Sequence, residues 1–118
     1  MATPLTVSAD RYDDGTPLLV AAGEIDRSNI ETFTRALTTV IAFADGTGGT
    51  GGPVTIDLTA VEYLDSAAIG ALSVHADQAP GMRLLANPYL IPVLRISGID
   101  QLATVQAAGV DPAGADPS

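Results

Sequence analysis

Apolar and polar residues alternate along several short segments of the chain, with the period of two that is typical of strands. In the clearest segment, Val54, Ile56 and Leu58 alternate with polar residues, which predicts a strand with two different faces. A second apolar run, residues 17–22, is nearly continuous and predicts a central strand. Weaker patterns predict the remaining strands, residues 5–9 and 82–86.

Helical spacing of apolar residues separates these strands. The clearest helix follows Ser28 and Glu31, whose spacing is that of a capping box, with Ser28 at the N-cap. A second helix is expected after Asp65 and Ser66, where small and apolar residues follow a short apolar turn. Ser66 is therefore placed at or beside the N-cap, where a hydroxyl meets unpaired backbone N–H groups.

A third helix is expected between Asn87 and Gly98. Pro88 suits the first position of such a helix, since proline has no N–H to leave unpaired there. Pro92 is unfavourable inside a helix, because it removes a backbone hydrogen bond. The helix is therefore either kinked or begins at Ile91.

Strands and helices thus alternate in a chain of 118 residues, which predicts a single α/β domain. The glycine-rich segment Gly46–Gly52 lacks the Lys-Ser/Thr ending of a phosphate-binding P-loop and precedes a strand. It is interpreted as a flexible connection. Residues 109–118, rich in small residues and proline, are expected to form a disordered tail.

Composition narrows the possible functions. Fourteen acidic residues against five arginines give a net charge of −9, which argues against nucleic acid and anionic membranes and favours a partner with a basic face. No apolar run is close to the length of about 20 residues that a membrane-spanning helix needs, and no secretory signal is visible. Cysteine is absent, which excludes disulfides and thiol chemistry and fits a cytoplasmic location.

Three motifs resemble the STAS domain, the fold of bacterial anti-sigma factor antagonists. The segment Asp57–Ser66 is similar to the family signature, and Gly23–Asp26 to the turn after its second strand. The segment Asn87–Ile99 resembles its third helix. Two features depart from the family: Ala67 and Ala68 replace the usual Ser-Gly, and the usual C-terminal helix is not visible.

The resemblance implies a single STAS-type domain over residues 1–108, with a mixed sheet of four to five strands flanked by helices. It implies an anti-sigma factor antagonist without catalysis or a cofactor of its own. The partner would be an anti-sigma factor with a kinase-like, ATP-binding fold, which the antagonist binds to free the sigma factor. That partner would phosphorylate Ser66 and a phosphatase would reverse the reaction, so any nucleotide or metal belongs to the partner.

The resemblance also implies a partner-binding surface around Ser66. A structural interpretation stays open for each of its residues: Ser66 can be only a cap, Asp65 can simply favour the helix start, and Asp26 can be an ordinary turn residue. The small residues that follow Ser66 can simply allow the helix to pack closely against the sheet. The expected surface comprises six residues: Asp26, Asp65, Ser66, Ala67, Ala68 and Gly70.

Three other interpretations remain. The domain can be a regulatory or ligand-binding module for a nucleotide, a lipid or a transporter. It can also be a phosphorylation-independent antagonist, because the methyl groups of Ala67 and Ala68 can block a kinase. An enzyme is disfavoured: His75, the only histidine, lies nine residues after Ser66, about 13 Å of helical rise away. His75 is interpreted as a surface residue of its helix.

Overall fold

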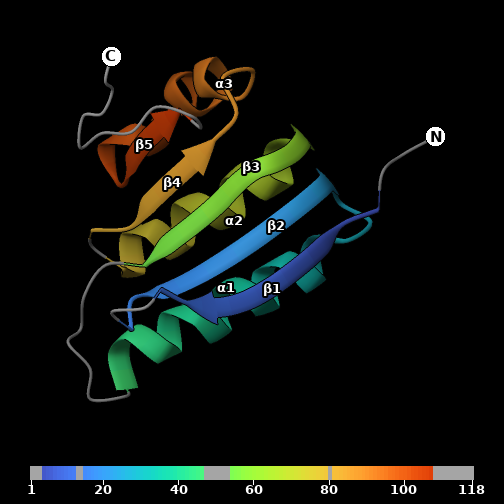
Figure 1. The fold of residues 1–118 in the computed structure, drawn as a ribbon. Helices are drawn as coiled ribbons and strands as arrows, with labels where there is room; N and C mark the ends of the chain where they lie inside the picture. The colour runs from blue at the N-terminus through green and yellow to red at the C-terminus, as the bar shows by residue number, and fades with distance from the viewer. Residues whose placement is uncertain (1–3, 13–14, 47–53, 80, 108–118) are drawn as a thin grey trace, which may run out of the picture.

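The computed structural model describes residues 4–12, 15–46, 54–79 and 81–107, so the expected glycine-rich connection and C-terminal tail fall almost entirely outside the described residues. Strands and helices alternate after an initial pair of strands (Figure 1). In chain order, the elements are β1 (Thr6–Arg11), β2 (Pro17–Ile25), α1 (Ile30–Gly46), β3 (Thr55–Leu64), α2 (Ser66–Gln78), β4 (Arg83–Ala86), α3 (Ile91–Ile96), the 3-10 turn η1 (Ile99–Gln101) and β5 (Thr104–Ala107).

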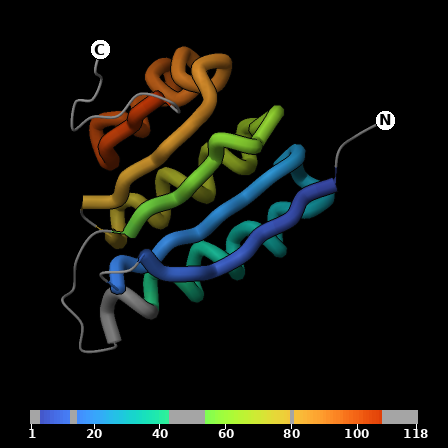
Figure 2. Tube along the Cα trace, in the orientation of Figure 1, coloured from blue at the N-terminus to red at the C-terminus, as the bar shows by residue number. Residues whose placement is uncertain are grey.

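The strands form one mixed sheet in the order β1-β2-β3-β4-β5. β1 pairs with β2 antiparallel, and the other neighbours pair parallel. β3 lies between β2 and β4 along the chain trace (Figure 2), and α1 and α2 cover one face of the sheet (Figure 1). Residues of β2 are alternately buried and half-buried, as expected for a strand with helices on one face only. The predicted α/β domain with a mixed sheet is confirmed.

The hydrophobic core lies between the sheet and the helices. Side chains spaced three and four residues apart in α1 are fully buried, as the sequence pattern predicts: Phe33, Leu37 and Val40. They meet the inward-facing residues of the central strands, of which Leu19, Ile56, Leu58 and Leu84 are fully buried.

β3 is longer than its period-2 pattern predicts. The sequence indicated a strand to Thr59 followed by a short turn, whereas the strand continues to Leu64. The pairing with β2 shifts register twice, and at each shift β3 contains one extra residue, as in a β-bulge. Beyond Leu58 the buried residues are therefore three apart, at Val61 and Leu64. This spacing made the strand resemble a turn.

The third helix begins at Ile91, with Pro92 in its first turn, which is one of the two predicted alternatives. Asn87 does not cap this helix. The Nδ2 atom of its side chain donates to the Val61 carbonyl at 2.6 Å, and the Oδ1 atom of the same side chain accepts from the Tyr89 N–H at 2.9 Å. Since β4 pairs with β3 only as far as Leu58, Asn87 supplies a donor to the part of β3 that extends beyond β4.

Candidate functional site

Asp65 ends β3 and starts α2. Its backbone is extended, and its Oδ1 atom accepts from the Ala68 N–H at 3.0 Å, which makes Asp65 the N-cap of α2. Ser66 is therefore the first residue of the helix, beside the cap, and its side chain is exposed. The cap is supplied by Asp65 because a carboxylate accepts an N–H bond and also suits the positive end of the helix.

Asp65 also joins the start of α2 to the loop that follows β2. Its Oδ2 atom accepts from the Arg27 N–H at 3.1 Å, and its own N–H donates to the Ile25 carbonyl at 3.2 Å. These two bonds lie on either side of Asp26 in the chain. The structure thus brings Asp26, Asp65 and Ser66 together at the carboxyl ends of two adjacent parallel strands.

Asp26 is held in a turn of its own. Its Oδ1 atom accepts from the Ser28 hydroxyl and, at 2.9 Å, from the Ser28 N–H. The Ser28 hydroxyl, followed by its N–H, lowers the pKa of the Asp26 carboxyl, because both bonds favour the ionised form. Asp26 therefore carries a negative charge over a wider pH range than an ordinary aspartate.

The capping box predicted at Ser28 and Glu31 is wrong. α1 begins at Ile30, and Ser28 lies before it with its hydroxyl committed to Asp26. Asn29 occupies the turn in its place: its side chain accepts from the Asp26 N–H and donates to the Glu24 carbonyl, each at 2.9 Å. The support that Ser28 gives Asp26 was missed. An Asp-x-Ser sequence before a helix is a signal for such an Asx turn.

One face of α2 is open to solvent, and we call it the low face because it begins with small side chains. Ser66, Gly70 and Val74 lie four residues apart on this face and are exposed. A Cβ atom placed on Gly70 would have no heavy atom within 4 Å, so close packing of this helix does not require a glycine there. Ala67, next to Ser66, is half-buried, whereas Ala68 is fully buried and lies beneath the surface that a partner can contact.

We name the exposed and half-exposed residues gathered here the Ser66 surface: Asp26, Asp65, Ser66, Ala67 and Gly70. Its surroundings are acidic. Residues 24–28 and 60–70 contain four acids, Glu24, Asp26, Glu62 and Asp65, and one base, Arg27. The Ser66 surface therefore combines a serine hydroxyl at a helix start, nearby carboxylates and a first part of α2 whose exposed side chains are small.

His75 is not a surface residue, contrary to the prediction. It is buried between α2 and α1, with 8% of its surface exposed. Its Nδ1 atom donates to the Ala71 carbonyl at 2.8 Å, since a carbonyl can only accept, and its Nε2 atom lies 3.3 Å from the Thr38 hydroxyl. Both ring nitrogens therefore serve the packing of the two helices, which leaves this ring no role toward Ser66.

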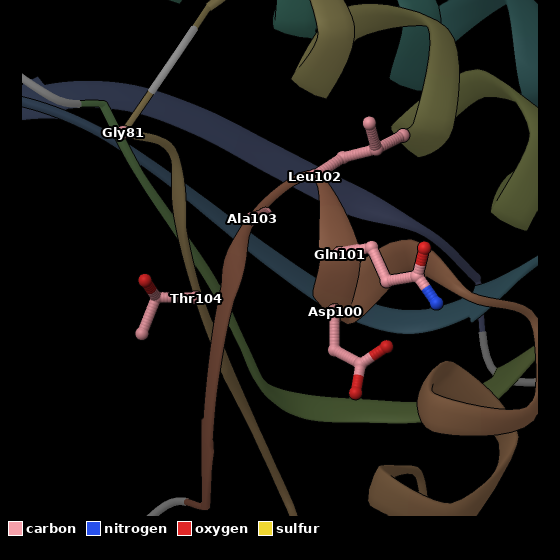
Figure 3. Close-up of a pocket in the computed structure, with 6 residues that line it drawn as sticks. All are labelled: Gly81, Asp100, Gln101, Leu102, Ala103 and Thr104. Atoms are coloured by element: carbon pink, nitrogen blue, oxygen red, sulfur yellow. The ribbon is translucent and has the colours of Figure 1, made fainter.

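The Ser66 surface carries no recognisable catalytic or metal-binding apparatus. Among the described residues, no group of three or more His, Cys, Asp or Glu side chains could hold a metal ion. A surface hollow of about 200 Å³ lies at the amino ends of β4 and β5, opposite to the end that carries Ser66. Figure 3 shows the side chain of Thr104 pointing away from Asp100 and Gln101, so the polar groups of this hollow do not converge.

Within the described part of the chain, no helix combines the length and the apolar character that crossing a bilayer requires.

Comparison with known proteins adds a family and a fold. A family model described as "Mlab, STAS domain" matches residues 8–106. An anti-sigma factor antagonist from Mycobacterium paratuberculosis has a similar structure, with a TM-score of 0.73, 23% identity, and coverage of 86% of this chain and 85% of that one. The unphosphorylated anti-sigma factor antagonist SpoIIAA has a TM-score of 0.61 and 17% identity, covering 87% and 90%. No curated protein sequence matches the chain.

Proposed function

Because the protein belongs to the STAS domain family, and because its exposed Ser66 stands beside Asp26 and Asp65, we propose that it is an anti-sigma factor antagonist that binds through the Ser66 surface. Two proteins of similar fold are themselves described as anti-sigma factor antagonists. The observation that carries the proposal is the pair of hydrogen bonds between Asp65 and residues 25 and 27, since they hold two loops as one continuous surface. The bound anti-sigma factor would then release its sigma factor.

Charge favours a basic partner. The net charge of −9 and the acids around Ser66 attract a positively charged surface and accelerate its encounter with this one. The Asp26 carboxyl, whose pKa is lowered by Ser28, stays ionised at all physiological pH values. Association should therefore slow as the ionic strength rises, because salt screens charges over about 8 Å at physiological concentration.

Phosphorylation of Ser66 would switch this interaction. A phosphate adds a charge of about −1.5 to −2, which the start of α2 tolerates because the helix N-terminus favours anions. A basic partner is still attracted to the added charge, so we assign the loss of affinity to the bulk of the phosphate and to the cost of desolvating it in a close fit. The modified protein would thus stay folded while losing affinity. A kinase-like anti-sigma factor would supply ATP and Mg²⁺, and a phosphatase would remove the phosphate.

The low face of α2 supports close approach. Gly70 is exposed, has no packing requirement, and lowers the stability of the helix by about 1 kcal/mol relative to alanine. A residue that costs stability without contributing to packing is consistent with a functional requirement. We assign to it the contact between α2 and the partner backbone, where a side chain would keep the two surfaces apart.

A phosphorylation-independent antagonist is the second candidate. It rests on the departure from the family's Ser-Gly at residues 67 and 68, which changes the chain directly after Ser66. The obstacle to a kinase is smaller than the sequence suggests, because alanine is smaller than the serine that it replaces at position 67, and Ala68, which replaces a glycine, is fully buried. Both candidates use the same binding surface.

Substitutions of Ser66 separate the two candidates. Binding of a purified kinase-like anti-sigma factor is measured by calorimetry, and phosphate transfer with ATP and Mg²⁺ is followed by mass spectrometry. We expect Ser66→Ala to bind like wild type and accept no phosphate, and Ser66→Asp to bind at least about tenfold more weakly, equivalent to about 1.4 kcal/mol. Thr32→Asp is the matched control, because it adds the same charge in the first turn of α1 at another exposed position.

Three results are decisive. Phosphate on wild type but not on Ser66→Ala supports the switch. Binding without any phosphate transfer rejects the switch and favours the phosphorylation-independent antagonist. If Ser66→Asp and Thr32→Asp weaken binding equally, the loss is not specific to position 66, and the Ser66 surface is not the binding site.

A further inference from the structure

The segment around α3 exposes apolar side chains on one face. Tyr89 and Ile96 are each 87% exposed and Val93 is 41% exposed, while Pro92 is also exposed. Their spacings of three, four and seven residues place them along one side of the turn and helix. We name these four residues the apolar strip.

The core does not need the apolar strip. α3 packs inward through other residues, Leu90 and Leu94, which are 6% and 0% exposed. Single exposed apolar residues are common, but a contiguous row on one helix marks an interaction surface. Tyrosine in particular is enriched at protein interfaces, because its ring contributes a large contact area. The described residues leave the strip open to solvent.

The distribution of charge indicates what covers the strip. Residues 1–82 contain eleven acids and three arginines, whereas residues 83–107 contain two arginines, Arg83 and Arg95, and one acid, Asp100. A basic partner is therefore attracted to the first part of the chain and not to the strip. Two copies of this chain, which repel each other elsewhere, meet the least repulsion here.

The charges next to the strip are also self-complementary. Arg95 precedes Ile96 in α3, and Asp100 lies in η1, the element that follows α3 and packs against it; both are exposed. In a two-fold symmetric contact, if residue i of one copy contacts residue j of the other, then residue j of the first copy contacts residue i of the second. Arg95 of each copy can therefore approach Asp100 of the other, which forms two equivalent ion pairs.

We propose that the protein forms a homodimer through the apolar strip, with α3 of one copy packed against α3 of the other. α3 lies near β4 and β5, at the other edge of the sheet from β1 and α1 (Figure 1). The strip shares no residue with the Ser66 surface, so the dimer can be tested separately from the function proposed above. Each dimer presents two Ser66 surfaces.

Sedimentation equilibrium of the purified full chain tests the dimer, over about 1 µM to 1 mM protein. Wild type should associate as a dimer within this range. The double variant Tyr89→Ser with Ile96→Ser should dissociate at least tenfold more readily, without unfolding, because both side chains are already exposed. Val74→Ser is the matched control: Val74 is 56% exposed on α2, outside the strip, and its replacement should leave the dissociation constant unchanged.

Charge reversal gives a second test that does not depend on the apolar residues. Arg95→Asp and Asp100→Arg should each weaken the dimer, and the two together should restore it, because the pair is re-formed with opposite polarity. A wild type that stays monomeric up to about 1 mM overturns the proposal and assigns the strip to a different protein. The proposal also fails if the Tyr89 and Ile96 double variant keeps the wild-type constant, and the two-fold pairing fails if combined reversal restores nothing.

Discussion

Replacing Gly70 by alanine should make the protein more stable and a weaker binder. Glycine inside a helix is less favourable than alanine by about 0.8–1.0 kcal/mol. The added methyl group meets no heavy atom within 4 Å, so neither a clash nor a new contact changes this value. The free energy of unfolding should rise by about 1 kcal/mol, which corresponds to roughly 4 °C in the melting temperature of a domain near 100 residues.

Urea unfolding followed by circular dichroism measures the stability, and calorimetry with the purified anti-sigma factor measures the affinity. The methyl group should hold the partner away from α2 and weaken binding at least about tenfold. Ala42→Gly provides the reverse control, because Ala42 is exposed on α1, away from the Ser66 surface. It should lower the stability by about 1 kcal/mol and leave the affinity unchanged.

Two results would refute this reasoning. If Gly70→Ala is less stable than wild type, the added methyl group meets another part of the protein, and the space around Gly70 is not open as described. A stabilised variant with unchanged affinity would remove Gly70 from the partner-binding surface, and the low face of α2 would then need another explanation.

Substitutions at three further positions test the supports of the site. Asp65→Ala should lower the free energy of unfolding by about 1–2 kcal/mol through the lost cap. Asp65→Asn should lower it less, because its single amide oxygen can still accept the capping bond, although it loses the second oxygen that accepts from Arg27. Ser28→Ala should raise the pKa of Asp26 toward its ordinary value, which NMR titration measures. In wild type, ionised Asp26 stabilises the fold above its unfolded pKa, and this stabilisation is lost as the pH falls through the lower pKa of the folded state. Asn87→Ala should cost about 1–3 kcal/mol in urea unfolding if the Val61 carbonyl is left unpaired, and an unchanged stability would show that water replaces the amide.

The order of strands and helices as far as α3 was predictable because these elements have local patterns, whereas β5 (Thr104–Ala107) was not among the strands predicted from the sequence. The buried positions Phe33, Leu37 and Val40 follow from helical spacing alone. The location of Asp65 and Ser66 at the start of a helix was predictable too. Which of the two caps the helix was not, since serine and aspartate are equally good caps. The choice depends on the Arg27 N–H, which reaches Asp65 from 38 positions away.

The remaining differences also come from contacts distant in sequence. His75 was assigned to the surface because nothing in α2 alone indicates which side faces Thr38 of α1. The start of α1 was misplaced because Ser28 and Asn29 are adjacent and both residue types can cap a helix. Asp26 decides between them by taking the Ser28 hydroxyl.

The two bulges of β3 determine where this protein tolerates insertions and deletions. Between Leu58 and Asp65 every residue has an assigned place: Val61 and Leu64 point inward, and the intervening pairs are exposed. Removing one residue would bring a polar side chain inward and draw Asp65 away from Ile25, so α2 would begin without its connection to the Asp26 loop. In a library of length variants, this segment should therefore keep its length even where its exposed residues change freely.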